Sequence, residues 1–102
     1  MTPDAFRELA LSLAGTTERP HFDRTAFTVR RNYATLPPDG RTANLCLDPA
    51  GQDHFISLRP DIFSKVPNKW GDRGWTQLSL AGADTDITLS ALRYGWQLAG
   101  GT

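Results

Sequence analysis

The sequence predicts a single α+β domain, a two-layer sandwich in which an antiparallel sheet of about five strands carries the N- and C-terminal helices on one face. Apolar residues recur at helical spacing near both ends, whereas the middle of the chain alternates short apolar stretches with Gly, Pro, Asn and Asp. The 102 residues suffice for one hydrophobic core but not for two. We therefore expect one domain over residues 1–99 and a tail at residues 100–102.

The first expected element is a helix that begins after Thr2 and ends by Gly15. Thr2 can cap this helix, and Pro3 suits its first position, where no backbone N–H is needed. The apolar residues that fall on one face of the helix are Phe6, Leu9, Ala10 and Leu13. Residues 16–23 are polar and turn-prone, so no regular element is expected there.

A β-hairpin is expected next. Residues 26–29 and 33–36 alternate as strands do, with Phe27 and Val29 inward in the first of them. Residues 30–32 interrupt the alternation and are typical of a tight hairpin tip. The tip holds two guanidinium groups in solvent, those of Arg30 and Arg31.

The turn sequence Pro-Pro-Asp-Gly at 37–40 leads into a third strand at 43–47. Leu45 and Leu47 share one face of that strand, so Cys46 lies on the other. Cys46 is the only cysteine, which excludes an internal disulfide and fits a reducing compartment. With no base beside it in the sequence, Cys46 is typical of an inert buried thiol rather than a nucleophile.

The second half of the chain predicts a short helix and two more strands. Asp48 can cap the helix, and Pro60 must end it. Residues 62–63 lead into a fourth strand, and residues 75–80 alternate as a fifth. The inward residues of the fifth strand are Leu78 and Leu80.

The final helix starts at residue 84 or 86, because either aspartate can cap it. Its apolar residues cover a wide arc, as in a helix that is largely buried. They are Ile87, Leu89, Ala91, Leu92, Tyr94, Trp96, Leu98 and Ala99.

Residues 63–75 join the fourth and fifth strands and hold both lysines and two of the three tryptophans of the chain. Pro67, Gly71 and Gly74 each break regular structure, so we expect a connection rather than an element of its own. We expect any binding partner to lie near this dense set of aromatic and cationic side chains.

The net charge of the chain does not by itself indicate a class of binding partner. Eleven basic residues balance eleven acidic ones, so a case for nucleic-acid binding must rest on local patches. No apolar run approaches the ~18 residues of a membrane span, and the first residues lack the pattern of a secretory leader. These features lead us to expect a cytoplasmic protein with no membrane partner.

Five segments taken together resemble the MmcQ/YjbR family in order and spacing. They are Phe27-Thr28-Val29, Tyr33-Ala34-Thr35-Leu36, Leu45-Cys46-Leu47, Gly74-Trp75-Thr76-Gln77-Leu78 and Leu92-Arg93-Tyr94. The resemblance implies a two-layer fold like that of frataxin and CyaY, a small cytoplasmic bacterial protein, and a DNA-binding role. The family often has a lysine after the third strand, where this chain has Asp48, so one positive charge of the implied binding surface is missing.

The sequence offers one candidate nucleic-acid site, built from cations that could neutralise phosphates and from an indole that could stack on an unpaired base. Its residues are Arg30, Arg31, Lys65, Lys69, Trp70 and Arg73. The alternative is that Trp70 and Trp75 close the rim of the core while the neighbouring charges only solvate the loop.

The sequence does not favour a metal site or an enzyme. Asp4 and Glu8 are the only carboxylates one turn apart on the first helix, and a hard cation needs several that converge. His21 and His54 have no second ligand at metal spacing. Catalysis by Cys46 would need a base and an orienting group, and neither is evident. We therefore expect no cofactor, no metal and no catalytic residue.

Two functions remain open at this point. The first is a non-enzymatic DNA-binding protein that uses the hairpin tip and residues 63–75. The second is a protein-binding or small-ligand module that uses exposed tryptophans as apolar anchors, with no nucleic-acid role. A monomer is favoured in either case.

Overall fold

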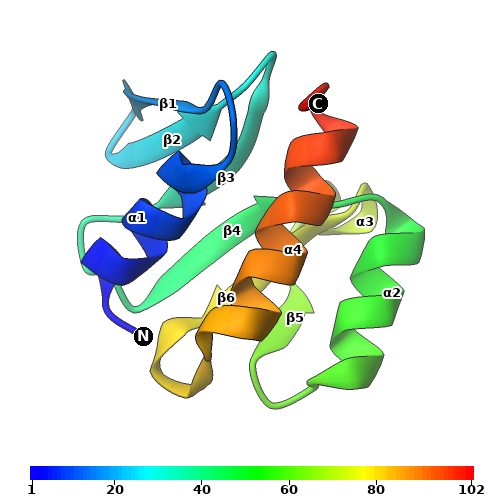
Figure 1. Cartoon of the computed structure of the whole chain (residues 1–102). Helices are drawn as coiled ribbons and strands as arrows, with labels where there is room; N and C mark the ends of the chain where they lie inside the picture. The colour runs from blue at the N-terminus through cyan, green and yellow to red at the C-terminus, as the bar shows by residue number, and fades with distance from the viewer.

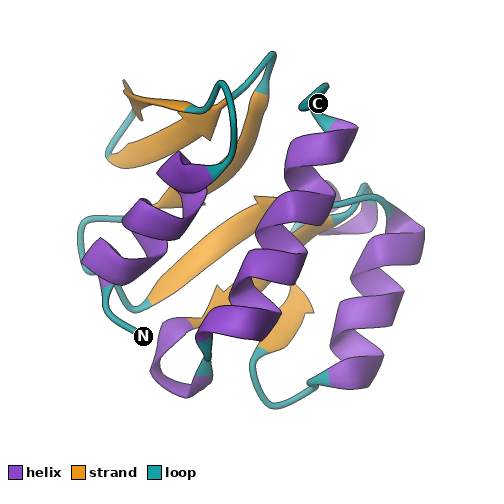
Figure 2. Cartoon of the chain, in the orientation of Figure 1, coloured by secondary structure: helices purple, strands orange, loops and turns teal.

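Three helices lie on one face of a six-stranded antiparallel sheet (Figures 1 and 2). The computed structural model describes residues 1–102. Along the chain the elements are α1 (Pro3–Ser12), β1 (Thr17–His21), β2 (Arg24–Thr28), β3 (Asn32–Leu36), β4 (Thr42–Cys46), α2 (Pro49–Leu58), β5 (Phe63–Lys65), α3 (Lys69–Asp72), β6 (Trp75–Ser79), a 3-10 turn (Leu80–Gly82) and α4 (Thr85–Leu98). The strands are ordered β1-β2-β3-β4-β6-β5 across the sheet. The predicted α+β class and layer arrangement are confirmed, with one strand more than expected.

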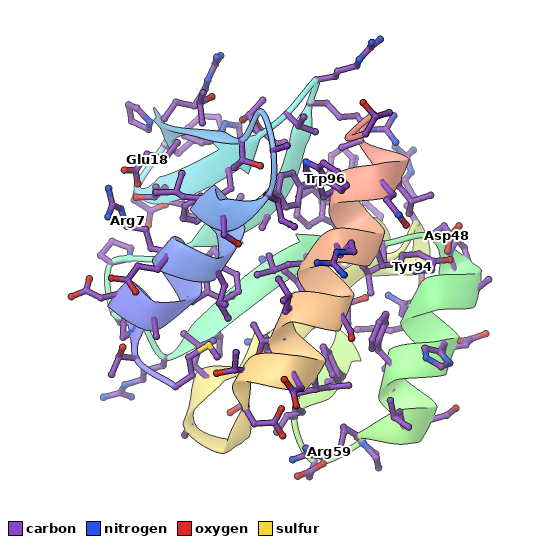
Figure 3. All side chains as sticks on the ribbon, viewed as in Figure 1. Arg7, Glu18, Asp48, Arg59, Tyr94 and Trp96 are labelled. Atoms are coloured by element: carbon purple, nitrogen blue, oxygen red, sulfur yellow. The ribbon has the colours of Figure 1, made fainter.

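The additional strand is β1, which occupies a segment that we expected to be irregular. β1 pairs antiparallel with β2 over its whole length, and all five of its residues are exposed. Pro20 is tolerated because β1 is the edge of the sheet. A fully exposed strand has no buried face, so its sequence shows no alternation of apolar and polar residues. Arg7 of α1 pairs with Glu18 of β1 and links the strand to the helix layer (Figure 3).

The helix starts follow the capping residues that the sequence offered. The Thr2 hydroxyl accepts a hydrogen bond from the Ala5 N–H at 3.1 Å, and the Asp84 carboxylate accepts one from the Ile87 N–H at 2.9 Å. Asp84 is therefore the cap of α4, which settles the choice that the sequence left open. Each cap satisfies backbone N–H groups that have no partner inside the helix.

The core lies between the helices and the inner face of the sheet. Phe6 of α1 packs edge-on against Phe27 of β2, with ring centroids 6.0 Å apart. The Tyr33 hydroxyl donates to the Ala10 carbonyl at 3.2 Å, so a buried polar group of β3 is satisfied by α1. Trp96 of α4 is also buried, and its indole N–H donates to the Ala14 carbonyl at 2.9 Å (Figure 3).

The C-terminal residues belong to this packing. The Gly101 N–H donates to the Trp96 carbonyl at 2.8 Å, and Gly101 is buried. Gly100 has a φ of 102°, a conformation that suits glycine at the end of a helix. The segment expected as a tail therefore begins as the closing turn of α4.

Asp48 joins α2 to α4. One of its carboxylate oxygens accepts hydrogen bonds from the Gly51 N–H and from the Tyr94 hydroxyl, each at 2.8 Å (Figure 3). Gly51 leaves room for the tyrosine, since a Cβ there would lie 2.3 Å from Cε1 of Tyr94. Asp48 thus has a structural role in this chain.

None of the helices combines the length and the apolar character that crossing a bilayer requires.

The Asp48 contacts predict a pH-dependent stability. The hydrogen bond from the Gly51 N–H, and then that from the Tyr94 hydroxyl, lower the pKa of Asp48 below its ordinary value of 3.8. The stabilisation is therefore complete above pH 3.8 and is lost as the pH falls through the lower pKa of the folded state. Urea unfolding between pH 2.5 and 7 measures it.

Asp48→Asn is the matched variant, because its amide oxygen can still cap α2 but cannot titrate. The difference in unfolding free energy between wild type and Asp48→Asn should be largest near pH 6 and should shrink on acidification. Parallel curves over the whole range would contradict this account of Asp48.

Candidate functional site

The face of the sheet opposite α1, α2 and α4 carries no long helix (Figures 1 and 2). Directly paired residues share a face, and one row on this face runs across five strands. The row consists of Ala26, Thr35, Asn44, Gln77 and Ser64. The next residue along β4 is Leu45, which is fully buried in the core, so the row points away from the helices. This uncovered face presents mainly small and polar side chains.

Residues 63–75 stand at one edge of the uncovered face and are more regular than the sequence predicted. They begin with β5, which is the expected fourth strand, and contain the single-turn helix α3, which replaces part of the expected connection. The Asn68 side chain caps α3 by accepting a hydrogen bond from the Trp70 N–H at 2.8 Å. The helix escaped prediction because one turn is too short to show periodicity, and because Pro67 and Gly71 suggested a break.

A buried glutamine fixes this segment. The side-chain amide nitrogen of Gln52, in α2, donates to the carbonyls of Gly71 at 2.9 Å and Trp75 at 3.0 Å, and it lies 3.2 Å from the Thr76 hydroxyl. Gln52 is only 1% exposed. Because the acceptors are backbone carbonyls on both sides of Arg73, Gln52 sets where α3 ends and where β6 begins.

Two glycines allow the close approach that this contact needs. A Cβ on Gly71 would lie 1.9 Å from the Val66 carbonyl oxygen. Gly74 has a φ of 115°, and a Cβ there would lie 2.1 Å from the Leu47 carbonyl oxygen. Both obstacles are backbone atoms, which cannot rotate away. The sequence predicted that these glycines interrupt regular structure. In the structure, their lack of a Cβ allows α3 to pack closely against the sheet.

This arrangement places two indoles at the surface. Trp70 is 47% exposed, and Trp75 is partly exposed on β6 opposite Cys46. The Arg73 guanidinium carbon lies 5.1 Å from the centroid of the Trp70 ring, and the Lys69 ammonium lies 5.7 Å from it. Both distances allow a cation–π contact. Trp70 is therefore an exposed side chain with two cations beside it and does not close the core.

The side chain of Arg31 extends from the turn between β2 and β3 and lies near the two indoles and Arg73. Its guanidinium donates to the carbonyl of Leu98 at the end of α4, at 2.8 Å, which holds the side chain in position. A hollow of about 530 Å³ lies there, and we call it the arginine hollow. Its lining residues are Arg31, Asn32, Cys46, Leu47, Asp48, Trp70, Arg73, Trp75 and Leu98.

A second hollow of about 350 Å³ lies on the other side of the two indoles, and we call it the aromatic hollow. Its lining residues are His21, Phe22, Arg24, Thr35, Asn44, Val66, Asn68, Trp70 and Trp75. Trp70 and Trp75 border both hollows. A ligand that has an apolar part and an anionic part can therefore place one part in each hollow while it contacts the same two indoles.

The charges of the arginine hollow favour an anion. Two guanidinium groups, from Arg31 and Arg73, face one carboxylate, that of Asp48, which already accepts two hydrogen bonds. Burial raises the pKa of the Cys46 thiol, and the nearby charge of Arg31 opposes that shift only in part. Cys46 is therefore a neutral thiol near pH 7 and a poor nucleophile.

Four of the six residues proposed from the sequence lie together. Arg31, Trp70 and Arg73 line the arginine hollow, and Lys69 lies beside the Trp70 ring. Arg30 and Lys65 lie elsewhere.

The side chain of Arg30 runs past Gly100, where a Cβ would be 2.5 Å from its Cδ. Lys65 pairs with Thr76, whose hydroxyl faces Gln52 on the helix side, so Lys65 lies on the helix side of the edge strand and not on the uncovered face. Neither residue lines a hollow.

Sequence reasoning missed the residues that form the far wall of the aromatic hollow. They are His21, Phe22, Arg24, Thr35 and Asn44. The hairpin of β1 and β2 brings the first three into place, and β1 was not recognised. A signal was present in Phe22, an aromatic residue among polar neighbours just before Asp23. Phe22 is 94% exposed and has a φ of 58°, as in the tip of a tight turn.

No group of three or more His, Cys, Asp or Glu side chains is arranged so that it could hold a metal ion.

Comparisons with known proteins show a likeness at the level of the fold. No protein-family model matches the sequence, and no curated protein matches it. Among solved structures, the chain is similar to the crystal structure of Deinococcus radiodurans protein DR2400, a DUF419 domain, with a TM-score of 0.76 and 22% sequence identity over 95% of this chain and 77% of that one. At this identity the likeness shows the shared fold.

The Gln52 contacts predict a loss of stability when the amide is removed. Gln52→Ala should lower the free energy of unfolding by about 2 kcal/mol or more, because it deletes buried hydrogen bonds and leaves a cavity. Urea unfolding at pH 7, followed by circular dichroism, measures the change.

Two further variants separate the causes. Gln52→Glu keeps the volume but loses the donor groups, so it should also be destabilised. Gln77→Ala removes an amide that makes no hydrogen bond within the protein and should change stability by less than ~0.5 kcal/mol. Wild-type stability of Gln52→Glu would contradict the role assigned to the hydrogen bonds.

Proposed function

We propose that this protein is a non-enzymatic DNA-binding protein of the MmcQ/YjbR type, and that the arginine hollow at the edge of its uncovered sheet face is the binding surface. The resemblance described above motivates the DNA-binding role and a cytoplasmic, bacterial setting. The DUF419 domain, which is related to the MmcQ/YjbR family, gives the fold-level support.

One observation carries the proposal. Arg31 and Arg73 come from distant parts of the chain, yet they line one hollow with Trp70 and Trp75. Phosphate groups bind guanidinium pairs through charge-assisted hydrogen bonds, and indoles stack on bases or pack against sugars. A net charge of zero does not argue against this use, because the local surface decides the affinity. The surface is small, so we expect modest affinity with strong salt dependence.

DNA binding should therefore depend on Arg31 and Arg73. For the Arg31→Ala/Arg73→Ala variant, affinity for a fluorescein-labelled single strand should fall by about tenfold or more, and the slope of log K against log salt should become shallower by ~1.4, that is ~0.7 for each lost phosphate contact. Fluorescence anisotropy from 20 to 200 mM salt measures both quantities.

Arg41→Ala/Arg93→Ala is the matched control, because it removes the same charge from two exposed arginines that line neither hollow. Lys65→Ala should also have little effect. Absence of binding to single-stranded and duplex DNA at 20 mM salt, or equal losses in the test and control variants, would overturn the proposal.

A protein partner is the second candidate, and the exposure of Phe22 favours it. A protruding aromatic residue across a hollow from two indoles is typical of the anchors at protein interfaces. If this role holds in place of DNA binding, Phe22→Ala should abolish self-association or partner capture and no oligonucleotide should bind. Light scattering against protein concentration gives the first readout.

A further inference from the structure

We infer that the aromatic hollow receives an unstacked base of single-stranded DNA, so that the protein binds single strands in preference to duplexes. This inference rests on the proposed function and adds which form of DNA is bound and where its base lies.

The size and lining of the aromatic hollow suit a flat heteroaromatic group. Its volume of about 350 Å³ is at the small end of the range for small-molecule sites, ~300–1,000 Å³. Phe22 and His21 form one wall, with ring centroids 4.8 Å apart, and Trp70 and Trp75 form the other. A base that enters this hollow can stack on an aromatic ring, as in proteins that bind single strands through stacking.

The polar groups at the hollow are free to pair with a base edge. The Asn44 side-chain amide has no hydrogen-bond partner within the protein, and neither do the indole N–H groups of Trp70 and Trp75. By contrast, the indole N–H of Trp96 and the amide of Gln52 are both used internally. An amide offers a donor and an acceptor side by side, which is the pattern on the edges of bases.

Arg24 shapes the floor of the hollow. Its Nε donates to the Thr35 hydroxyl at 2.8 Å, so the guanidinium lies along the sheet. Burial lowers the pKa of Arg24, but an arginine stays protonated at neutral pH. The floor therefore adds a positive charge beneath the aromatic walls.

The neighbouring arginine hollow supplies the place for the phosphate. Both hollows share Trp70 and Trp75 as a wall, so a nucleotide whose base enters the aromatic hollow can bring its phosphate to Arg31 and Arg73. Apolar walls beside two guanidinium groups complement a ligand with a flat apolar part and an anionic part. In a duplex the base faces are stacked and the edges paired, so the aromatic hollow would remain unused.

The test compares three DNA probes of equal length at 50 mM salt by fluorescence anisotropy. They are a single-stranded 12-mer, the same strand with all internal bases removed as abasic sites, and the 12-bp duplex. The single strand should bind roughly 5- to 150-fold more tightly than the abasic strand, the range expected for stacking one base, and more tightly than the duplex.

Two variants test whether the base binds in the aromatic hollow. Phe22→Ala removes an almost fully exposed side chain, so the fold should be kept, and it should weaken binding of the single strand by about fivefold or more without affecting the abasic strand. Asn44→Ala should weaken it by roughly 2- to 10-fold, as expected for one lost hydrogen bond. Gln77→Ala is the matched control, since Gln77 pairs with Asn44 across the sheet but lies outside the hollow.

The outcomes separate this inference from the proposed function. If the three probes bind equally and binding still depends on Arg31 and Arg73, the DNA-binding proposal stands and the base site is wrong. The base site is also wrong if Phe22→Ala and Gln77→Ala bind the single strand alike. If no probe binds, the proposed function itself fails, and the base site fails with it.

Discussion

A single buried amide, that of Gln52, determines where the two exposed indoles lie on the uncovered face. Gln52 reaches from α2 to the carbonyls of Gly71 and Trp75, and its position is possible because Gly71 and Gly74 let backbone segments come closer than any side chain would allow. The pair of indoles is therefore placed by α2, an element that lies on the other side of the sheet. A substitution in the helix layer would therefore change the position of the indoles on the uncovered face, although the substituted residue does not lie on that face.

The two hollows arise from the order of the strands. β6 lies between β4 and β5, which brings α3 to the uncovered face next to Cys46 and Asn44. The β1–β2 hairpin forms the opposite wall, and the β2–β3 turn delivers Arg31 to the end of α4. Each wall comes from a different connection, so the surface exists only in the complete fold.

Local rules predicted the helices well, because a cap such as Thr2 or Asp48 and a 3.6-residue period are both visible in the sequence. The same rules failed at β1, whose residues are all exposed and carry no alternation. They also failed to separate Arg31 from Arg30, since which of two adjacent side chains turns toward α4 depends on tertiary contacts. Phe22 and Asn44 were missed for the same reason.

The three tryptophans provide the most direct test of the central claim, that the uncovered face binds DNA through the indoles. Each indole N–H gives a separate NMR resonance, and these can be followed while a single-stranded oligonucleotide is added. Trp70 and Trp75 border both hollows, whereas Trp96 is buried in the helix layer and donates to Ala14. If DNA binds at the indoles, the resonances of Trp70 and Trp75 should shift and that of Trp96 should not. A shift of Trp96 alone, or no shift of any indole on saturation with DNA, would contradict it.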